Sequence, residues 1–154
     1  MTAEKRVVEL GLQLPSPPAP VASYLPAVRS GQLLFVSGQG PTKDGVPVYR
    51  GKVGGELSED EGRDAARLCA INLLAVLRSE LGSLDEVTRM VKLLVLVASE
   101  NGFDRQPFVA NAASDLLAEV FGPAGRHARS AVGTNQLPFD IPVEIELIAE
   151  VGSR

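Results

Sequence analysis

The stretch V-T-R-M-V-K-L-L-V-L-V, from Val87 to Val97, decides the fold that the sequence predicts. Its content of β-branched residues favours a strand. Polar and apolar residues alternate at its start, and from Leu93 onward every residue is apolar. Residues that are apolar on both faces are typical of a central strand covered from both sides. We therefore expect this segment to lie inside a sheet, not at its edge.

A helix is predicted on either side of this strand along the chain. Ser58-Glu59-Asp60-Glu61 has the pattern of a capping box, and Gly82 that of a C-cap. Between them, apolar residues keep three- and four-residue spacing at Ala66, Ala70, Leu73, Leu74, Leu77 and Leu81. The second helix is expected from about Phe103 to Phe121, ended by Gly122-Pro123-Ala124-Gly125. Its predicted apolar stripe is Phe108, Ala112, Leu116 and Val120.

The remaining strands complete a mixed sheet. They are predicted at Gln32–Val36, at Val46–Tyr49 (a hairpin across the turn Lys43-Asp44-Gly45), at Ala128–Thr134 and at Val143–Ala149. The order strand, strand, helix, strand, helix, strand, strand indicates an α+β sandwich with two helices on one face. The other face must meet water or another chain, and the strands that are apolar on both sides favour an oligomer.

Composition sets further bounds. The 154 residues fit one domain, and 45% hydrophobic with 22% charged residues is ordinary for a globular protein. A net charge of -4 argues against a broad nucleic-acid surface. The apolar runs are too short to span a bilayer, and the N-terminus has no secretory h-region. Cys69, the single cysteine, excludes an internal disulfide, and we expect a cytoplasmic protein.

Several motifs are better explained by structure than by chemistry. Ser37-Gly38-Gln39-Gly40 leads into a hairpin and not a helix, so a nucleotide cradle is not favoured. Cys69 lies near the apolar stripe of the first helix and is expected to act as a small hydrophobe. One histidine and one cysteine cannot form the usual zinc site. We interpret His127 as a loop or strand-edge residue.

Arg129 and Glu144 remain as candidates for chemistry. Strand alternation places Arg129 on one face with Ala131 and Gly133, whose small size leaves room beside the guanidinium. A guanidinium with free space around it is suited to bind a carboxylate through two hydrogen bonds. Glu144, on the following strand, could instead form a structural salt bridge with Arg129. For these residue types alone, the salt bridge is the favoured interpretation.

A family resemblance emerges from these residues. Ala128 to Glu146, A-R-S-A-V-G-T-N-Q-L-P-F-D-I-P-V-E-I-E, resembles the C-terminal signature of the YjgF/Rid family, the reactive intermediate deaminases. Ser37-Gly38-Gln39 resembles the S-G-Q of that family at the end of an early strand. Tyr24 and Asn111 stand where the family often has a tyrosine and an asparagine. The similarity runs from about Tyr24 to Val151.

The resemblance implies a fold and an activity. Family members share a chorismate-mutase-like sandwich and are typically homotrimers, with small-molecule sites in the clefts between subunits. Characterised members hydrolyse 2-imino and enamino acids to 2-keto acids and ammonia, without metal or organic cofactor. Carried over, Arg129 would bind the substrate carboxylate and Glu144 would activate water or shuttle a proton. Backbone groups around Ser37-Gly38 and Ala131 would hold the substrate, and Tyr24 and Asn111 would line the cleft.

The chain also departs from the family pattern and is similar to a divergent branch. His127 replaces a proline, Ala131 a frequent cysteine, and Gly133 and Asn135 larger or basic residues. Two alternatives to the deaminase are therefore kept. The first is a non-catalytic trimer that binds small carboxylate metabolites. The second is the ribonuclease activity named for some relatives, against which stand the acidic chain and the lack of a histidine pair.

Overall fold

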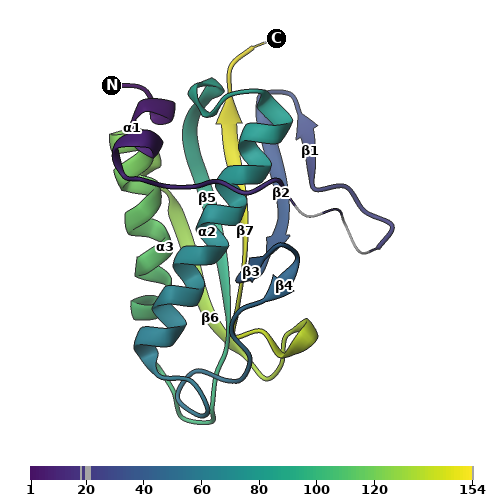
Figure 1. Cartoon of the computed structure of the whole chain (residues 1–154), viewed down its shortest axis with the longest axis vertical. Helices are drawn as coiled ribbons and strands as arrows, with labels where there is room; N and C mark the ends of the chain where they lie inside the picture. Colours follow the sequence, from purple (N-terminus) through teal and green to yellow (C-terminus); the bar gives the residue numbers. More distant parts are fainter. Residues whose placement is uncertain (18, 20–21, 154) are drawn as a thin grey trace.

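The computed structural model describes residues 1–17, 19 and 22–153, and these form one five-stranded sheet with helices packed against one face (Figure 1). The strand order is β1-β2-β7-β5-β6. Only β5 and β6 pair in parallel, so the sheet is mixed, as predicted. The strands are β1 (Ala27–Ser30), β2 (Leu33–Gln39), β5 (Val87–Ala98), β6 (Ala128–Thr134) and β7 (Val143–Val151).

Strand β5 lies inside the sheet, as its sequence predicts. It pairs with β7 on one side and β6 on the other, so that Leu93 is the neighbour of both Leu147 and Arg129. Leu93, Val95 and Val97 are fully buried beneath the helices. Their alternation with half-buried residues gives the sheet a helix-covered face and an open face.

Helix α2 (Glu59–Leu81) crosses the covered face, and its predicted ends are confirmed. The Ser58 hydroxyl accepts a hydrogen bond from the Glu61 amide at 3.1 Å, and the Ser58 amide donates to the Glu61 carboxylate at 3.3 Å. Gly82 ends the helix in the left-handed conformation, with φ 83°. Small buried residues, including Ala66, Cys69 and Ala70, allow α2 to pack close to the sheet.

Helix α3 (Gln106–Phe121) begins three residues later than predicted, and its buried face differs from the predicted stripe. The residues packed into the core are Val109, Ala110, Ala113, Leu116, Leu117 and Val120. Phe108 lies outside this set, with its ring between the guanidinium groups of Arg63 and Arg105 at 4.4 and 4.6 Å. Phe108 was assigned to the core from its spacing with Ala112, Leu116 and Val120, but its ring contacts two arginines at the edge of the core instead.

One α-helix and one strand were not predicted from the sequence. Helix α1 (Ala3–Glu9) is held by Glu4, whose carboxylate accepts two hydrogen bonds from Arg78 at 3.1 and 2.6 Å. Strand β1 follows the proline-rich segment and pairs with β2. The predicted hairpin is present but shorter: β3 (Thr42–Lys43) and β4 (Val46–Pro47) form a separate two-stranded sheet.

The open face of the sheet is apolar and half exposed in the single chain. Phe35 is 43% exposed and Val132 is 46% exposed. Leu94, Leu96 and Ile148 are partly buried. Among the described residues, no helix combines the length and the apolar character needed to cross a bilayer. Burial of the open face by further copies of the chain stays a prediction.

Candidate functional site

The seven residues proposed from the sequence fall into two groups on opposite faces of the sheet. Arg129 lies on the helix-covered face, beside Leu93 of β5, and reaches Asn111 on α3. Glu144 lies on the open face, beside Leu96 of β5. Glu144 lines a hollow there together with Tyr24 and Gly38.

The guanidinium of Arg129 is held against helix α3. Nη1 donates to Oδ1 of Asn111 at 2.9 Å and to Oγ of Ser114 at 3.0 Å. Nη2 donates to the carbonyl oxygen of Pro107 at 3.4 Å. The three acceptors lie four and three positions apart, so they share one side of the helix.

These contacts leave part of the guanidinium available to a ligand. A guanidinium has five N–H groups, and the three hydrogen bonds use both on Nη1 and one on Nη2. The remaining N–H groups are on Nε and Nη2, which share one edge. Two parallel N–H groups match the two oxygens of a carboxylate. Arg129 is therefore positioned by the protein and still has one binding edge.

The small residues beside Arg129 do not leave the open space predicted from the sequence. Ala131 is partly buried and packs against the core. A Cβ atom on Gly133 would come within 2.9 Å of Nε2 of Gln106, which donates to Ser99 and to the carbonyl of Phe103. The lack of a side chain on Gly133 thus allows Gln106 to lie against β6, and the Gln106 side chain fills the space at this end of the strand.

Glu144 lies directly against the backbone of β2. A Cβ atom on Gly38 would lie 3.0 Å from Cγ and Cδ of Glu144, so any other residue at position 38 would force the Glu144 side chain to shift. Burial raises the pKa of the Glu144 carboxyl, and the neighbouring Glu146 on the same face adds to the effect. A carboxyl group with a raised pKa is suited to exchange protons near neutral pH.

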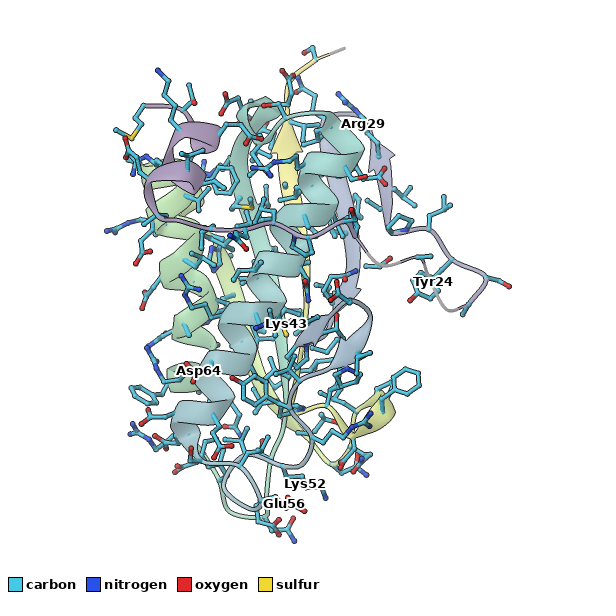
Figure 2. The ribbon with its side chains drawn as sticks, in the orientation of Figure 1. Tyr24, Arg29, Lys43, Lys52, Glu56 and Asp64 are labelled. Atoms are coloured by element: carbon cyan, nitrogen blue, oxygen red, sulfur yellow. The ribbon has the colours of Figure 1, made fainter. Side chains whose placement is uncertain are left out.

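The hollow beside Glu144 has a volume of about 640 Å³. Tyr24 reaches it from the loop ahead of β1, which projects from the body of the molecule (Figure 2). Phe139 and Ile141 line it from the segment before β7. Phe139 is 66% exposed and has a left-handed φ of 60°, which is uncommon for a bulky residue.

Ser37, predicted to bind substrate, uses its side chain to hold a neighbouring loop. Its hydroxyl donates to the carbonyl of Leu25 at 2.7 Å, and its amide donates to the carbonyl of Pro26 at 2.9 Å. Both acceptors follow Tyr24 directly in the chain. Ser37 therefore anchors the loop that carries Tyr24, and its side chain faces this loop.

The salt-bridge interpretation of Arg129 and Glu144 is wrong for the single chain. Strand β5 separates β6 from β7, so two strand spacings, about 10 Å, lie between the two residues. They also lie on opposite faces and three residues apart in register. Within the described part of the chain, the ion pairs are Arg78–Glu4 and Arg105–Glu59.

Ser114 was missed as a member of this site, and His127 was interpreted as a loop or strand-edge residue. His127 Nε2 lies 3.0 Å from Oγ of Ser114, which also contacts Arg129. Burial lowers the pKa of His127 most; the hydrogen bond to Gly125 partly opposes this effect, and the charge of Arg129 adds a smaller lowering. The spacing of Asn111 and Ser114 on α3 was the sequence signal available.

The other chemically reactive side chain lies inside the core. Cys69 is fully buried, its thiol is 3.5 Å from the carbonyl oxygen of Val143, and burial raises its pKa strongly. Its interpretation as a small hydrophobe is confirmed. Within residues 1–17, 19 and 22–153, no three His, Cys, Asp or Glu side chains gather as metal ligands would.

Comparison with known proteins places this geometry in a family. Residues 4–151 match the family described as "YjgF/chorismate_mutase-like, putative endoribonuclease". Protein TCP17 of Trypanosoma cruzi is 46% identical over 145 residues, covering 94% of this chain and 91% of that protein. The 2-iminobutanoate/2-iminopropanoate deaminase of Dermatophagoides farinae is 29% identical over 140 residues, covering 91% and 94%.

Solved structures agree with this assignment. The protein Atu1372 from Agrobacterium tumefaciens superposes with a TM-score of 0.91 at 44% identity, covering 97% of this chain and 92% of that chain. E. coli TdcF with bound serine superposes with a TM-score of 0.65 at 25% identity, covering 89% and 94%. The resemblance drawn from Ala128–Glu146 is thereby confirmed, and the chain belongs to the YjgF/chorismate-mutase-like family.

Proposed function

We propose that this protein hydrolyses 2-imino and enamino acids to 2-keto acids and ammonia. The observation that carries the proposal is Arg129, a fixed guanidinium with one free edge for a carboxylate. The second support is Glu144, a half-buried carboxyl with a raised pKa beside a hollow large enough for a small metabolite.

The proposed site is formed by two copies of the chain. In one chain, Arg129 and Glu144 lie on opposite faces of the sheet and cannot act on one small substrate. A neighbouring copy that covers the apolar open face could bring its own Arg129 edge to the hollow beside Glu144. The family resemblance implies a homotrimer with such clefts, and the half-exposed Phe35 and Val132 favour this burial.

The proposed reaction needs only a fixed cation and a base. Arg129 binds the carboxylate of the imino acid, and water attacks the imine carbon. Glu144 accepts a proton from this water as the C–O bond forms and passes the proton to nitrogen. The hydroxyl group of the tetrahedral intermediate then gives its proton to Glu144, which passes this proton to the amino nitrogen. As the C–O double bond forms, the C–N bond breaks, and ammonia and the 2-keto acid are released. An enamine first takes a proton on its β-carbon to become the imine.

Two relatives support the choice of substrate class. The Dermatophagoides farinae relative is named a 2-iminobutanoate/2-iminopropanoate deaminase. TdcF was crystallised with serine, a small molecule that carries a carboxylate. Both ligand classes offer the group that the free edge of Arg129 is suited to bind.

The test is keto-acid release from imino acids generated in situ by an amino-acid oxidase. The protein should accelerate release, and Arg129→Ala should abolish the acceleration. Arg126→Ala is a matched control, because Arg126 is exposed and lies three positions before Arg129. No acceleration across a panel of imino acids would refute the deaminase.

Binding without turnover is the second candidate function, and the bound serine of TdcF favours it. The same samples distinguish the two, because calorimetry with 2-oxobutyrate reports binding whether or not imino acids are hydrolysed. Ribonuclease activity, which the family description names, is less well supported. The net charge is -4, and the single histidine is tied to Ser114 and Gly125.

A further inference from the structure

The hydrogen bonds of His127 fix its tautomer. Nδ1 lies 2.8 Å from the carbonyl oxygen of Gly125, which can only accept, so Nδ1 must carry a proton. In the neutral ring, Nε2 is then an acceptor. Oγ of Ser114 lies 3.0 Å from Nε2 and therefore donates its proton to the imidazole.

The orientation of the Ser114 hydroxyl determines what it offers to Arg129. Because its proton is directed at His127, its oxygen faces Arg129 with free lone pairs, and Nη1 donates to it at 3.0 Å. The hydrogen bonds thus run in one direction, from Arg129 through Ser114 and His127 to Gly125. In such a chain each bond polarises and strengthens the next.

This series of hydrogen bonds ends at the backbone of Gly125, which is closely packed. A Cβ atom on Gly125 would lie 2.2 Å from the carbonyl oxygen of Leu117, so the Gly125 backbone packs directly on α3. At the near end, Asn111 accepts the second N–H of Nη1. Arg129 is therefore held from two sides by groups that belong to one rigid unit.

We infer that Ser114 and His127 are positioning residues, which hold Nη1 of Arg129 so that the Nε edge of the guanidinium faces the ligand. This inference rests on the proposed function, in which Arg129 binds the substrate carboxylate. Neither residue needs to touch the substrate. Their effect is to restrict the guanidinium to one plane, so that a carboxylate pays little ordering entropy when it binds.

Other charged groups near His127 must be separated from this effect. Asp115 of α3 and Arg126 line the same groove as His127 and Arg129. Within the described residues, neither side chain forms a hydrogen bond with any of the groups that link Arg129 to Gly125 through Ser114 and His127. Asp115→Asn therefore changes the local charge while leaving the hydrogen bonds intact, and it serves as the control.

The experiment uses the 154-residue protein labelled with ¹⁵N, with the Arg129 Nη1–H signals assigned by their loss in Arg129→Lys. The wild type should show His127 with its proton on Nδ1 and slowly exchanging Arg129 Nη1–H protons, because Asn111 and Ser114 accept both of them. Ser114→Ala and His127→Leu should lose that protection and bind 2-oxobutyrate about five- to tenfold more weakly. Ser114→Thr and His127→Gln keep an acceptor in place and should restore affinity to within about twofold. Asp115→Asn should bind as the wild type does.

The outcomes separate this inference from the proposed function. Wild-type protein with the His127 proton on Nε2 overturns the inference without any variant. Unchanged Arg129 protection and affinity in Ser114→Ala and His127→Leu overturn it as well. If the wild type does not bind 2-oxobutyrate but Arg129 protection depends on Ser114 and His127, the positioning role stands and the proposed function fails.

Discussion

Gly38 of β2 lies directly beneath the side chain of Glu144 on β7, and a Cβ atom at position 38 would come within 3.0 Å of Cγ and Cδ of Glu144. The S-G-Q motif therefore has a steric reason for its glycine. The position of the proposed base depends on a missing side chain on the neighbouring strand.

Gly38→Ala is expected to displace Glu144 from its position. We predict a loss of at least about tenfold in imino-acid hydrolysis, because small displacements of a reacting group are costly. The melting temperature should change by only ~1–3 °C, because the half-buried carboxylate can move aside. Steady-state kinetics and thermal melts measure the two effects.

Gly152→Ala is the matched control for this change. Its added Cβ atom would meet nothing closer than Oε2 of Glu86 at 3.7 Å, an ordinary contact. Its turnover and melting temperature should equal those of the wild type. Full turnover in Gly38→Ala would contradict the assigned place of Glu144.

Glu144→Gln is expected to make the protein more stable at neutral pH. The folded-state pKa of Glu144 is raised by burial and by Glu146, so the native state binds this proton more tightly than the unfolded chain does. The ionised Glu144 carboxylate therefore lowers the free energy of unfolding. This cost is absent below the pKa of the unfolded chain, and it appears as the pH rises through the raised pKa of the folded state. The neutral amide removes that cost, while turnover is lost.

Thermal melts at several pH values measure this prediction. At pH 7 the variant should melt ~1–3 °C above the wild type, and the difference should vanish near pH 4. Glu150→Gln is a control that removes a carboxylate from the other end of the same strand, opposite Leu33 of β2. Unfolding of Glu144→Gln would show instead that the carboxylate is structural.

Asn72 is expected to hold the hairpin beside the hollow. It is a buried polar residue on α2, and its Nδ2 donates to the carbonyl oxygens of Gly40 and Thr42 at 2.9 and 3.0 Å. Asn72→Leu keeps the branched shape of the side chain but leaves both carbonyls without this donor. We predict a loss of about 3 kcal/mol, a fall of roughly 6–12 °C in melting temperature.

Asn135→Ala gives the baseline for Asn72→Leu. Asn135 is exposed, so its truncation should change the free energy of unfolding by less than about 0.5 kcal/mol. Urea titrations of both variants measure the difference. A stability of Asn72→Leu equal to that of the wild type would mean that water replaces the lost donor.

Local signals in the sequence were sufficient for much of the fold. Ser58 and Glu61 fixed the start of α2 because the capping box uses only neighbouring residues. The bounds of β6 were predicted correctly for a similar reason, since turns flank it. Strand β1 was missed because four residues between a proline-rich segment and a turn carry little pattern.

The site was harder to predict because it depends on strand order. The faces of β6 cannot be told apart from its composition, since both carry small residues, and Val132 is the larger apolar one yet faces outward. Nothing in either strand alone reveals that β5 lies between Arg129 and Glu144. Likewise, the space beside Gly133 is filled by Gln106, which lies 27 positions earlier in the chain.

The placement of Arg129 and Glu144 on opposite faces has a genetic consequence. If each site takes Arg129 from one subunit and Glu144 from the next, two inactive proteins can complement each other. In a randomly mixed trimer of Arg129→Ala and Glu144→Gln chains, about a quarter of the sites would unite an intact Arg129 with an intact Glu144. Co-refolding the two inactive variants should therefore recover activity that neither has alone, as in intragenic complementation between alleles of one gene.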